Sequence, residues 1–393
     1  MKKFIFPLLI LAVFSACEEA PEVIISSYDC QLGFPHQSDS HPKSTDLQAA
    51  FDQVAAVSPG MQVAVKTTDG NSWLAAAGYA DMQEQVRMEN CHPLMVGSIS
   101  KTFTGVLIMQ LHDEGILDVK DALSAWLGQD LIGEIANADQ VSLEQLLHHT
   151  SGIRDYLGNE QYLKSLNVPY LLETQAEKLR YIYGKKAPFT PGERYSYSNT
   201  NYVLLGLVVE KARQMPLWDA VDMYIVQPLG LSHTQMGTHQ QPIPEGTARP
   251  YRLRGKQTYE DIYEVAVSDA ATGDGGMASN MQELVVFMEG LFGGKLMSDS
   301  ALQLMITNEV KTGPDGADFS WPEEGYGLGI SVWRTPYGLA YGHTGSTSSY
   351  DAFLFYFPDT EQSLAIGYSV SANDEIWGIR REMRLNLLEI LFQ

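Results

Sequence analysis

The chain has 393 residues, of which 45% are hydrophobic, and its 26 basic and 48 acidic residues give a formal net charge of −22. This length can bury a large core, either as one big domain or as two lobes. The negative charge and the lack of a basic cluster argue against nucleic acid and anionic lipid as partners.

The N-terminus has the pattern of a targeting segment. A basic start is followed by the apolar run 4–14 and then by small residues and Cys17. This run is too short to cross a bilayer as a stable helix, so residues 1–16 are predicted to be a signal peptide. The pattern resembles a bacterial lipoprotein signal, with Cys17 as the lipidated first residue, although Phe14 replaces the usual Leu and leaves ordinary signal cleavage as the alternative. Either way we expect export to the periplasm or cell envelope, with residues 17–45 as a lipid-anchored tether and lead-in.

Two further cysteines, Cys30 and Cys91, follow Cys17. In an oxidising compartment a single remaining pair is a candidate disulfide. The alternative is two unrelated free thiols. Their spacing does not indicate a metal site, and no cofactor is expected.

From residue 46 onward the chain reads as one folded domain that ends at residue 393. The first elements expected are a helix over 46–57, two strands over 61–66 and 72–78 joined by the hairpin signal 68–71, and an apolar helix from Ser98 that ends at Gly115. Residues 116–269 are helical and loop-rich, with amphipathic stretches at 141–148, 171–182 and 200–213. The last elements expected are strands over 328–334, 338–343, 350–357 and 363–370, and an amphipathic helix over 374–392.

This order predicts an α+β fold. Strands at both chain ends would form one antiparallel sheet flanked by helices, in an α/β lobe of residues 46–115 and 270–393. Residues 116–269 would form an inserted all-helical lobe.

Ser98 and Lys101 are the first residues with a chemical pattern, because they lie one helical turn apart at the start of an apolar helix. A serine hydroxyl is a poor nucleophile until a nearby base takes its proton, and an amine in a partly desolvated pocket can do so. The helix N-terminus also offers free N–H groups to a developing oxyanion. A second Ser-x-x-Lys, Ser40 to Lys43, has Pro42 before the lysine and lacks the helical context.

Tyr197 and Asn199 form a second candidate segment, on the loop that enters the apolar helix 203–209. A phenol beside the Lys101 ammonium could move the leaving-group proton. The Asn199 amide could hold Lys101 and a substrate amide.

A third candidate segment is His343-Thr344-Gly345-Ser346, at the end of a predicted strand. Gly345 would allow a substrate to approach the backbone closely, and the Ser346 N–H could point at an oxyanion together with the N–H of Ser98. The similar segment 311–313 is followed by Pro314, which has no N–H to donate.

Together the three segments resemble the serine β-lactamase and penicillin-binding-protein family, most closely its class C β-lactamase and D-alanyl-D-alanine carboxypeptidase branch. The family pattern is Ser-x-x-Lys, Tyr-x-Asn and then Lys-Thr-Gly or His-Thr-Gly. The flanking stretches 146–156, 191–210, 271–279 and 341–359 are also similar to the family. The resemblance covers about residues 46 to 393 and implies a two-lobed fold with the site between the lobes.

The resemblance also implies roles for individual residues. His343 stands where many class C β-lactamases have Lys, and a neutral imidazole is a weaker anchor for a substrate carboxylate. His-Thr-Gly is more similar to the D-stereospecific peptidases and esterases of the branch. His149 is expected to be structural, and Gly275 and Gly276 are expected to shape the cleft floor.

The sequence therefore predicts an exported serine hydrolase that acts through an acyl-serine intermediate, most similar to a D-Ala-D-Ala carboxypeptidase or a D-aminopeptidase. Its partner would be a small-molecule or peptide substrate, with the peptidoglycan stem peptide as a candidate. The alternatives are an esterase or β-lactamase of the same fold, a penicillin-binding sensor with little turnover, and a structural envelope lipoprotein, which leaves the three motifs unexplained.

Overall fold

A computed structural model describes residues 30–393 except 35–37, 256–257, 267–270, 313–322 and 371–373. The predicted signal peptide and Cys17 lie outside the described residues. Among the helices that the structure describes, none combines the length and the apolar character needed to span a membrane.

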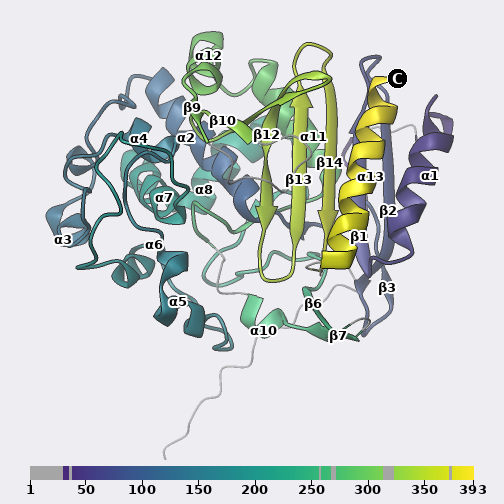
Figure 1. The fold of residues 1–393 in the computed structure, drawn as a ribbon, viewed down its shortest axis with the longest axis horizontal. Coiled ribbons are helices and arrows are strands. Elements are labelled where there is room, and N and C mark those ends of the chain that lie inside the picture. Colours follow the sequence, from purple (N-terminus) through teal and green to yellow (C-terminus); the bar gives the residue numbers. More distant parts are fainter. Residues whose placement is uncertain (1–29, 35–37, 256–257, 267–270, 313–322, 371–373) are drawn as a thin grey trace, which may run out of the picture.

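The centre of the fold is a nine-stranded antiparallel sheet that joins both ends of the chain (Figure 1). The N-terminal strand β1 pairs with the C-terminal strand β14, Val63 lying opposite Ile366. The predicted assembly of the sheet from both chain ends is therefore confirmed. In sheet order the strands are β3 (Val86–Arg87), β2 (Ser72–Asp81), β1 (Gly60–Lys66), β14 (Gln362–Tyr368), β13 (Asp351–Phe357), β12 (Gly338–Ser346), β11 (Ser331–Thr335), β10 (Glu323–Tyr326) and β9 (Val310–Lys311).

Both faces of this sheet are covered, because its central strands alternate between two apolar clusters. In β13, Phe353 and Phe355 belong to the cluster under α1 (Ser44–Ala55) and α13 (Asp374–Phe392), whereas Leu354 belongs to the cluster on the opposite face. Side chains along a strand point to alternate faces, so a strand buried on both sides must be apolar throughout. This explains why the run 351–357 is apolar at almost every position.

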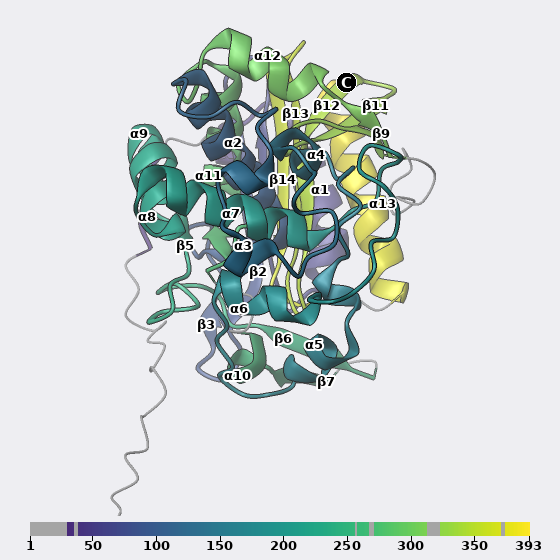
Figure 2. The ribbon, with the colours of Figure 1, turned by 90° about the vertical axis from the view of Figure 1, so that its left-hand side faces the viewer.

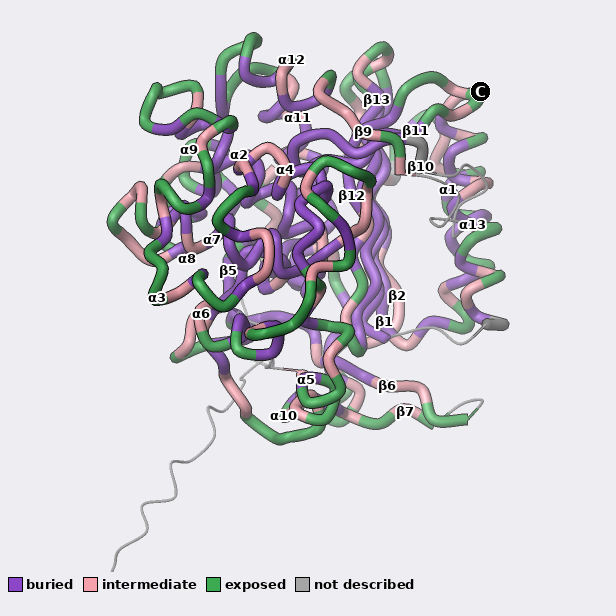
Figure 3. Tube along the Cα trace, turned by 60° about the vertical axis from the view of Figure 1, so that its left-hand side comes forward, coloured by how far each residue is buried: buried purple, intermediate pink, exposed green. Residues whose placement is uncertain are grey.

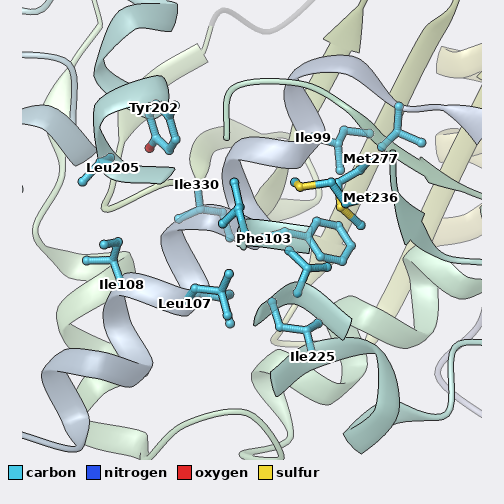
Figure 4. Packing of buried hydrophobic residues seen from close by; sticks show 14 of the residues in the cluster. Ile99, Phe103, Leu107, Ile108, Tyr202, Leu205, Ile225, Met236, Met277 and Ile330 are labelled. Atoms are coloured by element: carbon cyan, nitrogen blue, oxygen red, sulfur yellow. The ribbon is translucent and has the colours of Figure 1, made fainter. Parts of the chain in front are cut away.

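The helix α2 (Ser100–Asp113) lies at the centre of the molecule, on the opposite side of the sheet from α1 and α13. It is buried from Ser100 to Leu111, and its Phe103 and Leu107 lie among other buried apolar side chains (Figures 3 and 4). Phe103 stacks on Phe287 of α11 (Met281–Phe292), with the ring centroids 3.9 Å apart. A helix that is apolar all round must be surrounded by other elements. Gly115, predicted to end this helix, has a left-handed φ of +71° just beyond it.

The inserted segment is mainly helical, but it is not all-helical as predicted. Its largest helix is α7 (Asn199–Arg213), which packs against α2 (Figure 2). Its strand β5 (Gln235–Met236) joins β4 (Leu94–Met95) and β8 (Met277–Ser279) in a small sheet, and β6 (Tyr251–Arg254) and β7 (Thr258–Asp261) form a hairpin. The other helices of the insertion are α3 (Gln129–Ile132), α4 (Leu143–Leu147), α5 (Glu160–Ser165), α6 (Gln175–Lys178), α8 (Leu217–Val221), α9 (Gln227–Leu229) and α10 (Tyr263–Ala266), and α12 (Asp299–Thr307) follows α11.

The structure joins Cys30 and Cys91 in a disulfide, with their Cα atoms 5.4 Å apart. The bond ties the lead-in segment to the folded domain across 61 positions of sequence. A ring nitrogen of His92 lies within 4.8 Å of both sulfurs, but sulfurs joined to each other offer no thiolate to a metal.

The second Ser-x-x-Lys copy has a structural function. The Lys43 ammonium donates hydrogen bonds to the carbonyl oxygens of Ile390 and Leu391, at 2.8 and 2.9 Å. These carbonyls end α13, where a cation complements the helix dipole. Lys43 therefore links the start of α1 to the end of the C-terminal helix.

Candidate active site

The predicted catalytic segments meet in one cleft of about 340 Å³. The cleft wall contains Ser98, Tyr197, Asn199, His343, Thr344 and Ser346, together with Gly275 and Gly276. A larger hollow of about 640 Å³ lies beside the disulfide and contains none of these residues. The rival lysine of segment 311–313, Lys311, is exposed on the edge strand β9 and does not line the cleft.

Lys101 is fully buried directly behind Ser98. Its Nζ donates to Ser98 Oγ at 3.0 Å, to Asn199 Oδ1 at 2.8 Å and to the main-chain oxygen of Asp274 at 2.7 Å. The predicted meeting of Ser98, Lys101 and Asn199 is present in the structure.

Two of these three partners are amide oxygens, which can only accept hydrogen bonds. A neutral amine has two N–H groups and one lone pair. The ammonium form of Lys101 donates to all three oxygens. In the neutral form, Asn199 and Asp274 accept the two N–H groups, so the lone pair points at Ser98 Oγ and can take the hydroxyl proton. The geometry therefore suits Lys101 to act as the base for Ser98.

Asp155 sets the orientation of the Asn199 amide, and the sequence analysis did not identify it. Its carboxylate accepts hydrogen bonds from Asn199 Nδ2 at 2.9 Å and from the Asn199 main-chain N–H at 3.2 Å. The amide oxygen must therefore face Lys101. Burial raises the pKa of Asp155, against the opposing effect of its hydrogen bonds from the Asn199 side chain and the Leu157 N–H. Asp155 lies in the stretch 146–156, and the similarity of this stretch to the family is the feature of the sequence that could have identified it.

Tyr197 lies over Lys101, with Nζ 5.0 Å from the ring centroid. The His149 ring packs on Tyr197 with the centroids 4.3 Å apart, and His149 Nδ1 accepts a hydrogen bond from the Ser198 N–H at 3.2 Å. His149 is fully buried and stands outside the cleft wall. These contacts support the structural role predicted for it, because they hold the turn that carries Tyr197.

The end of β12 lies directly against the start of the serine helix. A Cβ added to Gly345 would stand 1.8 Å from the carbonyl oxygen of Val96 and 3.0 Å from the Ser98 nitrogen. A Cβ on Gly97, whose φ is +51°, would lie 2.9 Å from the Ser346 nitrogen. Gly345 was expected to admit a substrate. In the structure, the group that lies against Gly345 is the backbone of residues 96–98. This backbone, and not a substrate, is therefore the reason that the position needs glycine.

The main-chain N–H of Ser346 is directed away from β13. The Thr347 N–H donates a hydrogen bond to the Tyr350 carbonyl at 2.8 Å, so Thr347 and Tyr350 form a hydrogen-bonded pair. Antiparallel pairs alternate, so Ser346 and Asp351 form a non-hydrogen-bonded pair. The pairing of β12 with β11 reaches only Gly342. The Ser346 N–H therefore lies on the side of the strand where Gly97 and Ser98 pack.

His343 lines the cleft, but both of its ring nitrogens are engaged. Nδ1 bonds to the carbonyl of Thr344, which can only accept, so Nδ1 carries the proton. Nε2 then accepts from the Tyr326 hydroxyl at 2.9 Å. Burial, with the nearby Lys101 charge, lowers the pKa of His343 to about 3. The imidazole is therefore neutral and has no free donor for a substrate carboxylate.

Acid should destabilise the protein through His343. The unfolded chain takes up a proton at this residue below about pH 6.5, whereas the folded protein does so only near pH 3. Stability contributed by the neutral ring is thus complete above pH 6.5 and decreases as the pH falls toward 3. We expect His343→Asn to reduce the slope of unfolding free energy against pH by up to about 1.4 kcal/mol per pH unit in this window. Urea unfolding of the parent and the variant between pH 4 and 8 measures this slope.

The matched control is His239→Asn, at a half-buried histidine outside the cleft. This variant should keep the slope of the parent protein. Equal slopes for the parent and the His343→Asn variant would show that His343 is not the acid-sensitive group.

Known proteins are similar to this chain over most of its length. The Beta-lactamase family model matches residues 47–390. Over 307 residues the chain is 26% identical to Penicillin-binding protein 4* of Bacillus subtilis, a match that covers 73% of this chain and 63% of that protein. It is 29% identical over 232 residues to a Beta-lactamase of Providencia stuartii, covering 59% of this chain and 55% of that protein. The chain thus spans less than two thirds of the length of these relatives.

Solved structures show the same fold over most of the chain. A D-stereospecific amidohydrolase from Streptomyces sp. is 27% identical with a TM-score of 0.71, and the match covers 88% of this chain and 98% of that one. The D-amino acid amidase from Ochrobactrum anthropi SV3 is 23% identical with a TM-score of 0.76, covering 89% and 98%, and this likeness shows the fold alone. With a family match across nearly the whole described domain, the chain belongs to the Beta-lactamase family.

Proposed function

We propose that this protein is a serine hydrolase that cleaves amide or peptide bonds next to a D-amino acid through a covalent acyl-serine intermediate. The observation that carries the proposal is the buried Lys101 amine, held by two fixed acceptors and 3.0 Å from Ser98 Oγ. No cofactor is needed for this reaction.

In the acylation step, Ser98 Oγ attacks the scissile carbonyl and its proton passes to Lys101. The Ser98 and Ser346 N–H groups stabilise the tetrahedral oxyanion. The C–N bond then breaks, and the leaving amine receives the proton through Lys101 and Tyr197. Water attacks the resulting ester, which releases the acid and restores the serine hydroxyl.

Two observations support D-stereospecific amides over β-lactams as substrates. His343 replaces the lysine that is frequent in class C β-lactamases, and its ring has no free donor for a β-lactam carboxylate. The likeness to the Streptomyces D-stereospecific amidohydrolase reaches 27% identity. The peptidoglycan stem peptide, which contains D-amino acids, remains a candidate substrate. Export and lipidation at Cys17 are part of the proposal and rest on the N-terminal sequence.

A substrate panel tests the proposal. The purified protein is assayed with a D-Ala-D-Ala peptide, D- and L-amino-acid amides, a p-nitrophenyl ester and nitrocefin, and intact mass is recorded after exposure to a fluorescent penicillin. We expect hydrolysis of a D-amide or D-peptide in preference to the L-form. Cleavage of the ester alone would indicate an esterase, and a stable penicillin adduct without turnover of any substrate would indicate a sensor.

A further inference from the structure

Asp274 is a buried carboxylate in the cleft wall that the acyl-transfer steps do not use. The residue is 6% exposed. Its Oδ2 accepts a hydrogen bond from the Tyr156 hydroxyl at 2.6 Å, and Tyr156 also lines the cleft. Its Oδ1 is buried and has no hydrogen-bond partner among the residues that the structure describes. A buried carboxylate oxygen without a donor is costly, so a second donor is expected there.

Asp274 lies close to the reacting serine. Its main-chain oxygen accepts from Lys101 Nζ at 2.7 Å, and the same Nζ lies 3.0 Å from Ser98 Oγ. In an amino acid amide the α-nitrogen is only two bonds from the carbonyl carbon that Ser98 attacks. A substrate nitrogen at that position is therefore within reach of the wall that contains Asp274.

The charges of the cleft favour a cation over an anion. Among the described residues in its wall, none is Lys or Arg. Lys101 stands behind the wall and already donates three hydrogen bonds, and His343 is neutral with both ring nitrogens engaged. A substrate carboxylate would thus meet no free cationic partner here, whereas an ammonium would meet Asp274. The net charge of −22 also attracts cations.

We propose that Asp274 binds the free α-ammonium of the substrate, next to the scissile carbonyl. The preferred substrates are then amides and peptides whose N-terminal D-residue is unblocked, and not C-terminal peptides recognised by their carboxylate. This inference rests on the proposed function and determines which end of the substrate the cleft recognises. Tyr156 holds the carboxylate through Oδ2, and the ammonium supplies the donor that Oδ1 lacks.

A binding measurement tests the inference without turnover. Calorimetry on the Ser98→Ala variant compares D-phenylalaninamide with N-acetyl-D-phenylalaninamide at pH 6.5. We expect the free amine to bind at least about tenfold more tightly, because charge-assisted hydrogen bonds to a buried carboxylate are strong. Adding Asp274→Asn should remove most of this difference. Adding Asp139→Asn, at an exposed carboxylate outside the cleft, should preserve it.

A turnover measurement separates this inference from the proposed function. The ratio of kcat/KM for D-phenylalanine p-nitroanilide to that for its N-acetyl form should fall as the pH rises past the amine pKa of about 8. Nα-acetyl-D-lysine p-nitroanilide places the ammonium on the side chain and should not be preferred. Equal binding of free and acetylated amides, or a parent ratio that does not change with pH, would overturn the role of Asp274, whether or not Asp274→Asn folds. Preferential binding without any turnover would instead overturn the hydrolase and leave the ammonium site in place.

Discussion

Replacing Ser98 with alanine should abolish hydrolysis of every substrate that the parent protein cleaves, with a fall in kcat of at least about 10⁴-fold. The change removes the oxygen that attacks the carbonyl, and Lys101 cannot replace it because two fixed acceptors hold its amine behind the cleft wall. Only one hydrogen bond to Lys101 is lost with the hydroxyl, so the fold should persist. Steady-state kinetics measure the loss of hydrolysis, circular dichroism measures the retained fold, and intact-mass analysis measures the loss of the acyl adduct.

The chain provides a matched control in its second Ser-x-x-Lys motif. Ser40 is exposed, and the lysine that follows it, Lys43, binds the end of α13. Ser40→Ala should therefore retain parental kinetics and the mass adduct. If the folded Ser98→Ala variant kept substantial hydrolysis of any substrate, Ser98 would not be its nucleophile.

Gly345→Ala should lower activity by about 10²-fold or more, although Gly345 has no side chain to take part in the reaction. The new Cβ would stand 1.8 Å from the Val96 oxygen and 2.8 Å from the Val96 carbonyl carbon. Both are backbone atoms at the start of the serine helix, which cannot turn aside as a flexible side chain can. β12 must therefore move away from Ser98, and the Ser346 N–H leaves the position required for the oxyanion. Overpacking of this kind also costs about 1–3 kcal/mol of stability.

The expected change in Gly345→Ala is mainly in kcat, measured at a temperature where the variant is folded. Gly378→Ala is the control, because its Cβ would meet nothing within 4 Å on the C-terminal helix. That variant should keep parental activity. Parental kcat in a folded Gly345→Ala protein would contradict the placement of the Ser346 N–H in the oxyanion site.

Several elements followed from local patterns alone. The apolar helix after Ser98, its end at Gly115 and the C-terminal helix 374–392 agree with the structure. The amphipathic stretch 171–182 does not form one continuous helix, because it is divided into the short α6 and a 3-10 turn, Leu179–Tyr181. Propensity summed over a window is a weak guide when tertiary packing sets the backbone.

The missed strands have a different cause. The strands β9 and β10 are short and lie at one edge of the sheet, and β6 and β7 form a separate two-stranded hairpin. Their local sequence has too few residues to display an alternating pattern. Their pairing depends on where the preceding chain places them.

The sequence by itself indicated Ser98 as the nucleophile and Lys101 as its base, because the two residues are separated by one helical turn, a distance that helix geometry sets. It also indicated Tyr197, Asn199 and the 343–346 segment through their order and flanking residues. The tertiary structure alone decided that Asp155 orients Asn199, that the Tyr156 hydroxyl binds the Asp274 carboxylate, and that Tyr326 engages His343. These contacts join segments that are far apart along the chain. Their separation in space is set by the packing of the inserted segment against α2 and the sheet, and spacing along the chain contains no information about it.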